Sequence, residues 1–136
     1  MNVIDGYIKV GRIKSTVAKK AHVKSAYIYI DESHLKHIEK KHGGYLAKLG
    51  IDAETFVRCI CQNFNQMRHG TESSVLLVVY RNNLHYVAAI DLNYSLKKGF
   101  WEVKTAQPRY SRAVLRLALM WTGAKNLSAG NGSRSF

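Results

Sequence analysis

The feature that most constrains the fold is a change in the period of the apolar residues near the middle of the chain. Phe56, Ile60 and Phe64 recur at helical spacing, whereas residues 74–92 are dense in β-branched and apolar side chains. The Asn82-Asn83 pair interrupts the second pattern and tolerates positive φ, as hairpin turns require. Helices followed by a meandering sheet predict an α+β fold, with N-terminal helices packed on one face of a twisted antiparallel β-sheet and the other face free.

Local signals give bounds for the expected elements. The first helix begins with a cap at Asp31 or Ser33 and runs to Lys41 or His42, where Gly43-Gly44 stops it. The second helix begins at Asp52 and ends near residues 68–70. Pro108 is expected to break the chain before residues 111–121, which suit a short helix or a long buried strand. The expected strands cover residues 27–30, 74–81, 84–92 and 100–105.

The 136 residues fit one domain with a segment of different composition at each end. Residues 1–25 are basic and weakly periodic, which predicts a partly ordered arm or a short leading strand. Residues 26–123 are expected to form the folded domain, and residues 124–136, rich in Gly, Ser and Asn, a flexible tail. No apolar run approaches the roughly 18 residues that span a bilayer, so we expect no membrane partner.

The charge balance predicts a polyanionic partner. The chain has 21 Lys and Arg against 9 Asp and Glu, a formal net charge of +12. Nucleic acid is the leading candidate and an acidic protein the next, because both gain from long-range attraction and counterion release. Cys59 and Cys61 are typical of reduced structural thiols in a cytosolic protein, and the first residues lack the order of a secretory signal.

Histidines are concentrated in the first expected helix. At about 100° per residue, His34, His37 and Lys41 share one stripe, and His42 lies on the neighbouring apolar stripe. Imidazoles exchange protons near neutral pH, so a stripe of this kind suits general acid–base chemistry. A satisfied core role for His42 and a solvated face for the others is an equally good interpretation. The spacing does not match a zinc helix, and we expect neither a metal nor another cofactor.

A second basic group follows the last expected strand. Lys104 and Thr105 stand at the strand end, where a hydroxyl and an ammonium can meet a phosphate oxygen, and Arg109, Tyr110 and Arg112 follow. The Arg fork matches phosphate geometry, and a Tyr hydroxyl can donate to an oxygen. Taken singly, each of these residues is more typical of an ordinary surface position.

The succession of elements resembles a known nuclease superfamily. A strand, a helix carrying His37-Ile38 and His42, a second helix, a hairpin and then Trp101-Glu102-Val103-Lys104-Thr105-Ala106-Gln107-Pro108 is similar to the barnase, EndoU, colicin and RelE-like (BECR) ribonucleases. Within them, the phage-associated and polymorphic, contact-dependent-inhibition toxin branches are nearest. The resemblance covers about residues 27–112. It implies a helix-plus-sheet ribonuclease, often the toxin domain of a larger exported protein, and a cognate immunity protein that neutralises it.

The resemblance places a catalytic histidine at His37 or His42 and a second cluster at Lys104, Thr105 and Tyr110. The sequence therefore predicts a monomeric, metal-independent endoribonuclease that acts in the cytoplasm of the producing or the target cell, on RNA that includes tRNA. Lys41, Arg109 and Arg112 are expected to bind phosphate. Two alternatives stay open: a nucleic-acid-binding module without catalysis, and a basic domain that binds an acidic protein.

Overall fold

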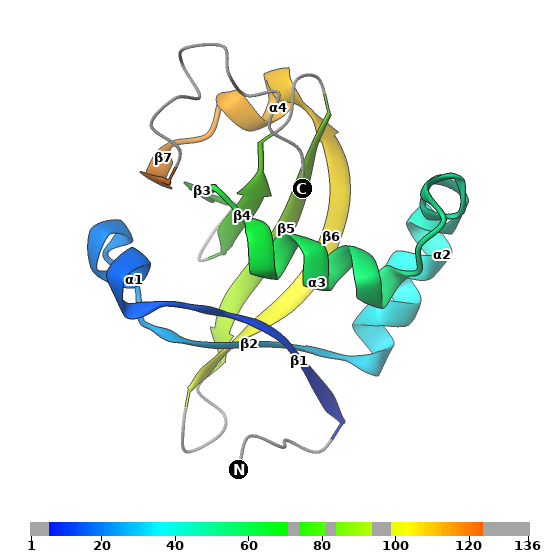
Figure 1. The fold of residues 1–136 in the computed structure, drawn as a ribbon, viewed down its shortest axis with the longest axis horizontal. Coiled ribbons are helices and arrows are strands. Elements are labelled where there is room, and N and C mark those ends of the chain that lie inside the picture. The colour runs from blue at the N-terminus through cyan, green and yellow to red at the C-terminus, as the bar shows by residue number, and fades with distance from the viewer. Residues whose placement is uncertain (1–5, 71–73, 81–83, 94–98, 124–136) are drawn as a thin grey trace.

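A computed structural model describes residues 6–70, 74–80, 84–93 and 99–123, and it has an α+β architecture (Figure 1). Its strands form one sheet in the order β1-β2-β6-β5-β4-β3-β7. The helices of the described residues are α1 (Ser15–Ala21), α2 (Glu32–Leu49), α3 (Ala53–Asn63) and α4 (Ser111–Leu115). The strands are β1 (Tyr7–Ile13), β2 (Ala26–Asp31), β3 (Gln66–His69), β4 (Val75–Val79), β5 (Leu84–Asn93), β6 (Phe100–Tyr110) and β7 (Leu119–Thr122).

The sheet is mixed, so the expectation of a purely antiparallel sheet is wrong. The β4–β5 hairpin is confirmed and β6 pairs antiparallel with β5, but β2 pairs parallel with β6 through Ile28 and Trp101. The cause is the place of β6, which inserts between β2 and β5. Its direction is fixed by its long antiparallel pairing with β5, and β2 meets its other edge in parallel.

Of the two expectations for residues 1–25, the short leading strand is confirmed by β1, and the partly ordered arm does not hold for residues 7–25, which belong to the same sheet and core. β1 pairs with β2 from Tyr7 to Ile13, with a bulge between Lys9 and Gly11. Val10 and Ile13 are fully buried, and this burial explains why a basic segment is folded. Residues 1–5 and the expected tail, 124–136, lie outside the described residues.

α2 is longer than the sequence predicted, and the helix end expected at Gly43-Gly44 is wrong. The side chain of Asp31 caps the helix by accepting from the backbone N–H of His34 at 2.8 Å, which confirms one of the two expected caps. The helix continues to Leu49 and ends at Gly50, which has a φ of 76°. Leu46 is fully buried beyond the two glycines, and the burial of such a side chain offsets their cost of about 1 kcal/mol each.

α3 begins at the expected cap, Asp52, which accepts from the backbone N–H of Thr55 at 2.8 Å. It ends at Asn63, and the residues expected to finish this helix form β3 instead. The tertiary pairing of β3 with both β4 and β7 outweighs the local pattern. No helix in the described part of the chain is long and apolar enough to cross a membrane.

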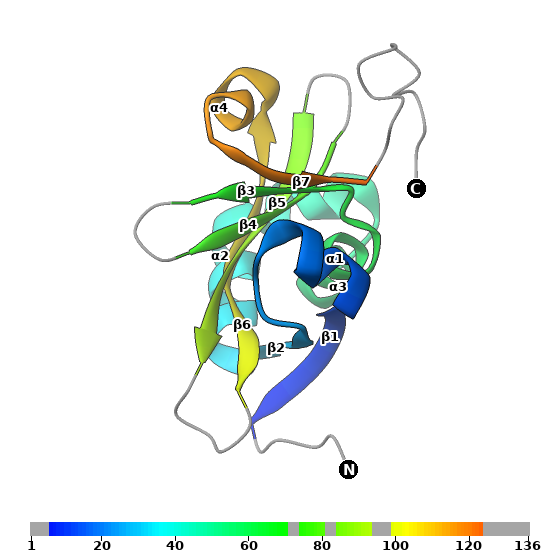
Figure 2. The ribbon, with the colours of Figure 1, turned by 90° about the vertical axis from the view of Figure 1, so that its left-hand side faces the viewer.

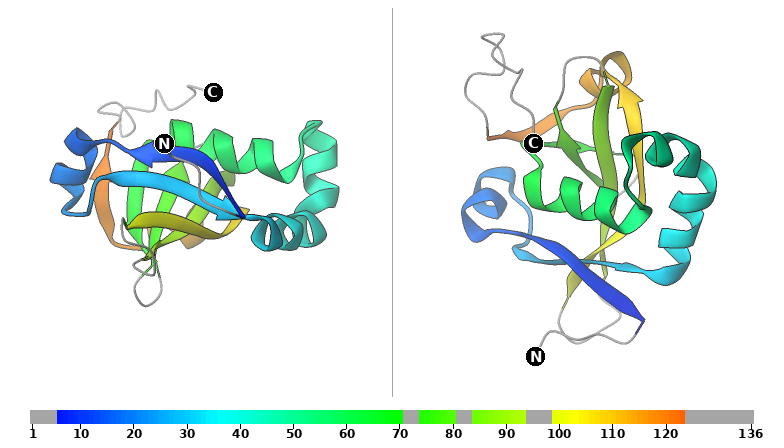
Figure 3. Two further views of the ribbon diagram at one scale, coloured as in Figure 1. Left: turned by 90° about the horizontal axis from the view of Figure 1, so that it is seen from below. Right: turned by 45° about the vertical axis from the view of Figure 1, so that its right-hand side comes forward.

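The main core lies between α2, α3 and the concave face of the sheet (Figures 1 and 3). The opposite face is only partly free. α4 folds back over β5 and β6, where Val114 packs with Leu76, Val78 and Val87 in a second, smaller cluster. Figure 2 shows α4 at this end of the sheet and, after it, β7 running beside β3 as the edge strand. The expected free face is therefore reduced to a groove beside the C-terminal segment.

Candidate active site

α2 lies along the edge of β6 that β2 leaves uncovered. His34, near the start of α2, approaches Glu102, and Tyr45, three turns later, meets the hydroxyl of Tyr86, whose strand partner is Pro108. Eleven helical residues rise about 16 Å and six strand residues about 20 Å, so the helix and the strand run side by side over this length. His34, the first residue of the stripe predicted to carry cations and imidazoles, thus lies beside β6, whereas His37 and Lys41 of the same stripe are exposed.

An aspartate–histidine pair stands where β2 ends and α2 begins. Asp31 Oδ1 lies 2.6 Å from His34 Nδ1, and Ser33 Oγ donates to the same oxygen at 3.1 Å. Burial alone would raise the pKa of Asp31, but the hydrogen bonds and the charge of His34 outweigh it and hold that pKa below its ordinary value. Asp31 is therefore a carboxylate at neutral pH that fixes the ring of His34.

Glu102 and Lys104 come to this pair from β6. Glu102 Oε2 lies 3.8 Å from His34 Nδ1, and Lys104 Nζ donates to Glu102 Oε1 at 3.3 Å. The Glu102 side chain is only 6% exposed, whereas those of His34 and Lys104 are 27% and 42% exposed. A buried carboxylate thus anchors two groups that reach solvent.

Tyr7 of β1 closes the same cluster. Its hydroxyl donates to Glu102 Oε2 at 3.4 Å. Burial raises the pKa of Tyr7, and the negative charges of Glu102 and Asp31 raise it further. The phenol of Tyr7 therefore keeps its proton at physiological pH and acts as a hydrogen-bond donor to Glu102. The cluster formed by Tyr7, Asp31, His34, Glu102 and Lys104 is called the His34 cluster below.

The other predicted residues of α2 differ in their surroundings. His37 and Lys41 are exposed, one turn and two turns after His34 on the same stripe. His42 is half-buried within α2, and its Nε2 has no hydrogen-bond partner among the described residues. Burial lowers the pKa of His42, and the charges of Lys41 and His37 lower it further, so its ring is neutral. The expected position of His42 at a helix end is wrong, because α2 continues past it.

The predicted residues after Lys104 lie elsewhere. Thr105 and Arg109 point to the α4 side of the sheet, opposite the main core, where they line a groove of about 230 Å³. Tyr110 is 75% exposed just before α4, and Arg112 is exposed within it. Among the described residues, no hydrogen bond, ion pair or ring contact joins these side chains to His37 or His42. Of the strand-end residues, the structure brings only Lys104 to the α2 histidine stripe.

The chain break expected at Pro108 is also wrong, because β6 continues through this residue. Pro108 lies beyond the part of β6 that pairs with β2, and a proline is tolerated on such an uncovered strand edge.

Buried polar residues near this groove have a structural explanation. Arg68 donates from Nε to Gln66 Oε1 at 3.0 Å and from Nη1 to the backbone oxygen of Leu117 at 2.7 Å. His85 is fully buried, with its ring 4.5 Å from that of Tyr80. Burial lowers the pKa of His85, and the charge of Arg68 lowers it further. Arg68 thus joins β3 to the segment between α4 and β7, and His85 of β5 packs against the residue that follows β4.

Sequence reasoning chose only Lys104 among the five members of the His34 cluster and missed the other four. Tyr7 was not singled out, and Asp31 was considered only as a helix cap. His34 was noticed on the stripe but not chosen, and its signal was the Asp31-x-x-His34 spacing, which puts a cap carboxylate beside the first-turn histidine. Glu102 was quoted only as part of a strand. Its position against α2 depends on the parallel pairing of β2 with β6, and no local pattern encodes that pairing.

Three members of the His34 cluster form the one group of potential metal ligands in the described part of the chain. One ligand atom each from Asp31, His34 and Glu102 lies within 4.8 Å of the others. These residues belong to β2, α2 and β6, so the spacing of residues in the sequence could not predict a metal site here. The ammonium of Lys104 already lies against Glu102, and a divalent ion at this position would face its positive charge.

In comparisons with models of known protein families, with curated proteins and with solved structures, nothing matched this chain.

Proposed function

We propose that the protein is a metal-independent endoribonuclease whose chemistry takes place at the His34 cluster. The observation that supports the proposal is the 2.6 Å contact between Asp31 Oδ1 and His34 Nδ1, beside the cation of Lys104. With Nδ1–H directed to the carboxylate, the neutral ring carries its lone pair at Nε2. A histidine oriented in this way is a general base, and a neighbouring ammonium stabilises a charged phosphorane.

The reaction follows from these groups. His34 Nε2 takes the proton of a ribose 2′-hydroxyl, the 2′-oxygen attacks the adjacent phosphorus, and the bond from phosphorus to the 5′-oxygen breaks. His37, one helical turn away and exposed, gives a proton to the departing 5′-oxygen. Lys104 and Lys41 carry the charge that accumulates on the phosphorane oxygens. The products are a 2′,3′-cyclic phosphate and a 5′-hydroxyl, and DNA, which has no 2′-hydroxyl, is not cut.

The decisive experiment compares single histidine variants on a labelled RNA oligonucleotide and on tRNA. We expect His34→Ala and His37→Ala each to lower the cleavage rate by about 10² to 10⁴, the usual loss for an acid–base group. His69→Ala is the matched control, because His69 is exposed on β3, outside the cluster. Mass spectrometry should find cyclic phosphate ends. If both variants cut RNA at the wild-type rate, the assignment is wrong.

A metal-dependent reaction at the same residues is the second candidate, and the clustering of Asp31, His34 and Glu102 favours it. The two candidates differ in their response to EDTA. Under our proposal EDTA leaves cleavage unchanged, whereas a metal enzyme loses activity, regains it with a divalent cation and releases 5′-phosphate or 3′-phosphate ends. A protein that binds RNA and DNA equally and cuts neither is the non-catalytic binding module.

We also propose an acidic protein partner of the immunity type. A domain of net charge +12 that cuts RNA endangers the cell that makes it, and complementary charge gives an inhibitor fast association. The expected interface includes the exposed Lys41 and Arg112 together with Arg109. Reversing two of these charges should slow association, and the rate for the wild type should fall as salt is raised.

A further inference from the structure

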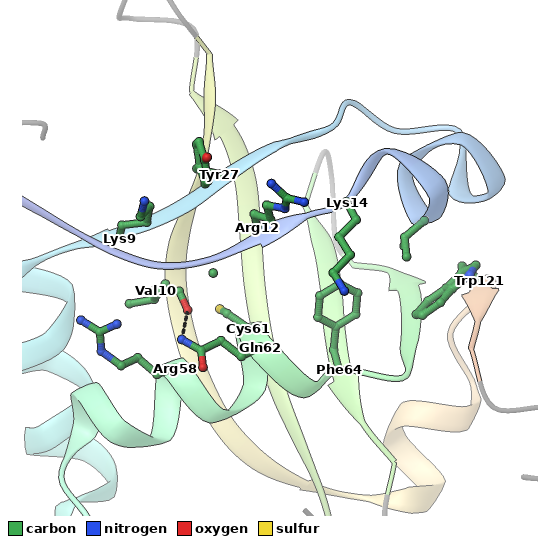
Figure 4. Close-up of a pocket in the computed structure, with 12 residues that line it drawn as sticks. Lys9, Val10, Arg12, Lys14, Tyr27, Arg58, Cys61, Gln62, Phe64 and Trp121 are labelled. Carbon is green, nitrogen blue, oxygen red and sulfur yellow. Dashed lines mark hydrogen bonds between the residues drawn. The ribbon is translucent and has the colours of Figure 1, made fainter. Parts of the chain in front are cut away.

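A pocket separate from the His34 cluster lies between β1 and α3 and is bounded at one end by β7 (Figure 4). Its volume is about 460 Å³, within the range of sites for small organic ligands. Both edge strands of the sheet contribute to it, because the sheet curls until β1 and β7 flank the end of α3.

The rim of the pocket is cationic. Lys9, Arg12 and Lys14 come from β1 and the turn after it, and all three are exposed. Arg58 comes from α3 and pairs with Glu54 at 2.9 Å, so its charge is largely compensated. None of the described residues that line the pocket is acidic. The rim therefore favours an anion, and Arg12 offers the planar fork that binds phosphate oxygens in pairs.

The inner wall is apolar and aromatic. Phe64 and Trp121 meet edge to face with ring centroids 5.8 Å apart, next to the buried Cys61 (Figure 4). Tyr27 lies at the other side, with Lys9 Nζ 4.5 Å above its ring. An aromatic wall below a cationic rim suits a ligand that has a flat ring and a phosphate on the same unit.

The pocket is held in shape by contacts between its two walls. Gln62 donates from Nε2 to the backbone oxygen of Val10 at 3.2 Å. Gly11 lies so close to α3 that an added Cβ would be 2.7 Å from the backbone oxygen of Cys61. A fixed wall lowers the ordering cost of binding.

β1 also connects the pocket to the His34 cluster. Tyr7 belongs to the cluster and Arg12 to the pocket rim, five residues along the same strand, which corresponds to about 16 Å. A polymer bound at the pocket can therefore extend along β1 to the proposed catalytic groups.

We infer that this pocket binds one unpaired nucleotide of the RNA substrate, with its base against Trp121 and Phe64 and its phosphate on Arg12 and Lys14. The ligand is single-stranded, because only an unpaired base presents its face to an aromatic wall. The inference rests on the proposed function in taking RNA as the polymer. Binding at the pocket does not require the chemistry at His34.

The experiment measures binding of a fluorescent, single-stranded 2′-O-methyl oligonucleotide, which lacks the nucleophilic hydroxyl and is not cut. We expect the double variant Arg12→Ala/Lys14→Ala to weaken binding about tenfold or more and to reduce the salt dependence. The matched control is Lys19→Ala/Lys20→Ala, which removes the same charge from exposed positions on α1 and should weaken binding less than about threefold. Thermal unfolding checks that both variants fold.

Tryptophan fluorescence tests the position of the base. Uridine and adenosine 5′-monophosphates should quench the emission of the wild type, and Trp121→Phe should abolish the quenching while Trp101, which is buried in the core, still emits. Nucleosides and inorganic phosphate, used separately, should bind more weakly than the nucleotides, and free nucleotides more weakly than the oligonucleotide.

Several outcomes overturn the inference: equal losses in the two double variants, quenching that persists in Trp121→Phe, or displacement of the oligonucleotide by polyglutamate as readily as by unlabelled RNA. The inference and the proposed function fail separately. If the wild type cuts RNA and Arg12→Ala/Lys14→Ala binds normally, only the pocket assignment is wrong. If nothing is cut but this variant loses binding, only the catalytic proposal is wrong.

Discussion

The contact of Gly11 with α3 makes a prediction about stability that can be worked out in both sign and size. A Cβ at this position would lie 2.7 Å from the backbone oxygen, 2.9 Å from the Cβ and 3.0 Å from the carbonyl carbon of Cys61. Two of these three atoms are backbone, so no side-chain rotation relieves the overlap. Gly11→Ala therefore requires β1 and α3 to move apart, and overpacking of this kind costs about 1 to 3 kcal/mol.

Part of this cost is offset because alanine restricts the unfolded chain, a gain of about 0.4 to 1 kcal/mol. The difference between the middle values of these two ranges leaves an expected net loss of about 1.3 kcal/mol in the free energy of unfolding, equivalent to a fall of about 4 to 5 °C in Tm for a chain of this size. Urea unfolding followed by circular dichroism measures it, with the slope m expected to stay unchanged.

Gly44→Ala is the matched control, since it adds the same methyl group in the middle of α2. A Cβ there meets nothing within 4 Å, and alanine is the better helix former by about 0.5 to 1 kcal/mol. We expect this variant to be more stable than the wild type. If Gly11→Ala unfolds within 0.5 kcal/mol of the wild type, or if both variants shift in the same direction, the packing of β1 on α3 described above is wrong.

Three further predictions concern the site and the fold. Lys104→Ala should lower the rate of RNA cleavage by a factor of about 10², measured under saturating RNA. Lys40→Ala, which removes the same charge from an exposed position on α2, should leave the rate unchanged. Asp52→Ala removes the cap of α3 and should lower the free energy of unfolding by about 1 kcal/mol in a urea titration. Folding lowers the pKa values of His42 and His85 from 6.5. Between those lowered values and pH 6.5 the unfolded chain therefore binds more protons than the folded chain. The free energy of unfolding should fall as the pH is lowered through that window. Urea titrations at pH 7.5 and below would contradict this prediction if stability were constant or rose on acidification.

Local signals in the sequence predicted the elements whose structure is determined locally. The caps at Asp31 and Asp52 and the hairpin of β4 and β5 are confirmed, because a capping side chain or a turn acts within a few residues. The helix end predicted at Gly43-Gly44 is wrong, because the burial of Leu46 outweighs the weak helix propensity of the two glycines.

The candidate site was harder to predict because its members meet through distant pairings. The stripe of α2 and Lys104 were both singled out, but their alignment depends on β6 lying beside β2. The direction of Thr105, away from α2, depends on the bulge where Ala89 pairs with Thr105 and Ile90 with Val103. A bulge changes which side chains share a face, and strand alternation counted from the sequence does not reveal it.

The parallel pairing of β2 with β6 has a consequence for the order in which the protein assembles. Ile28 pairs with Trp101, and the indole of Trp101 donates to the backbone oxygen of Lys24, so the first strands of the chain are completed by one of the last. At about 5 to 20 residues per second, a ribosome makes Trp101 roughly 4 to 15 s after Ile28. During this interval β2 has an open edge, and closing so long a loop is intrinsically slow. The two halves of the His34 cluster, on β2–α2 and on β6, therefore come together only after β6 has been synthesised.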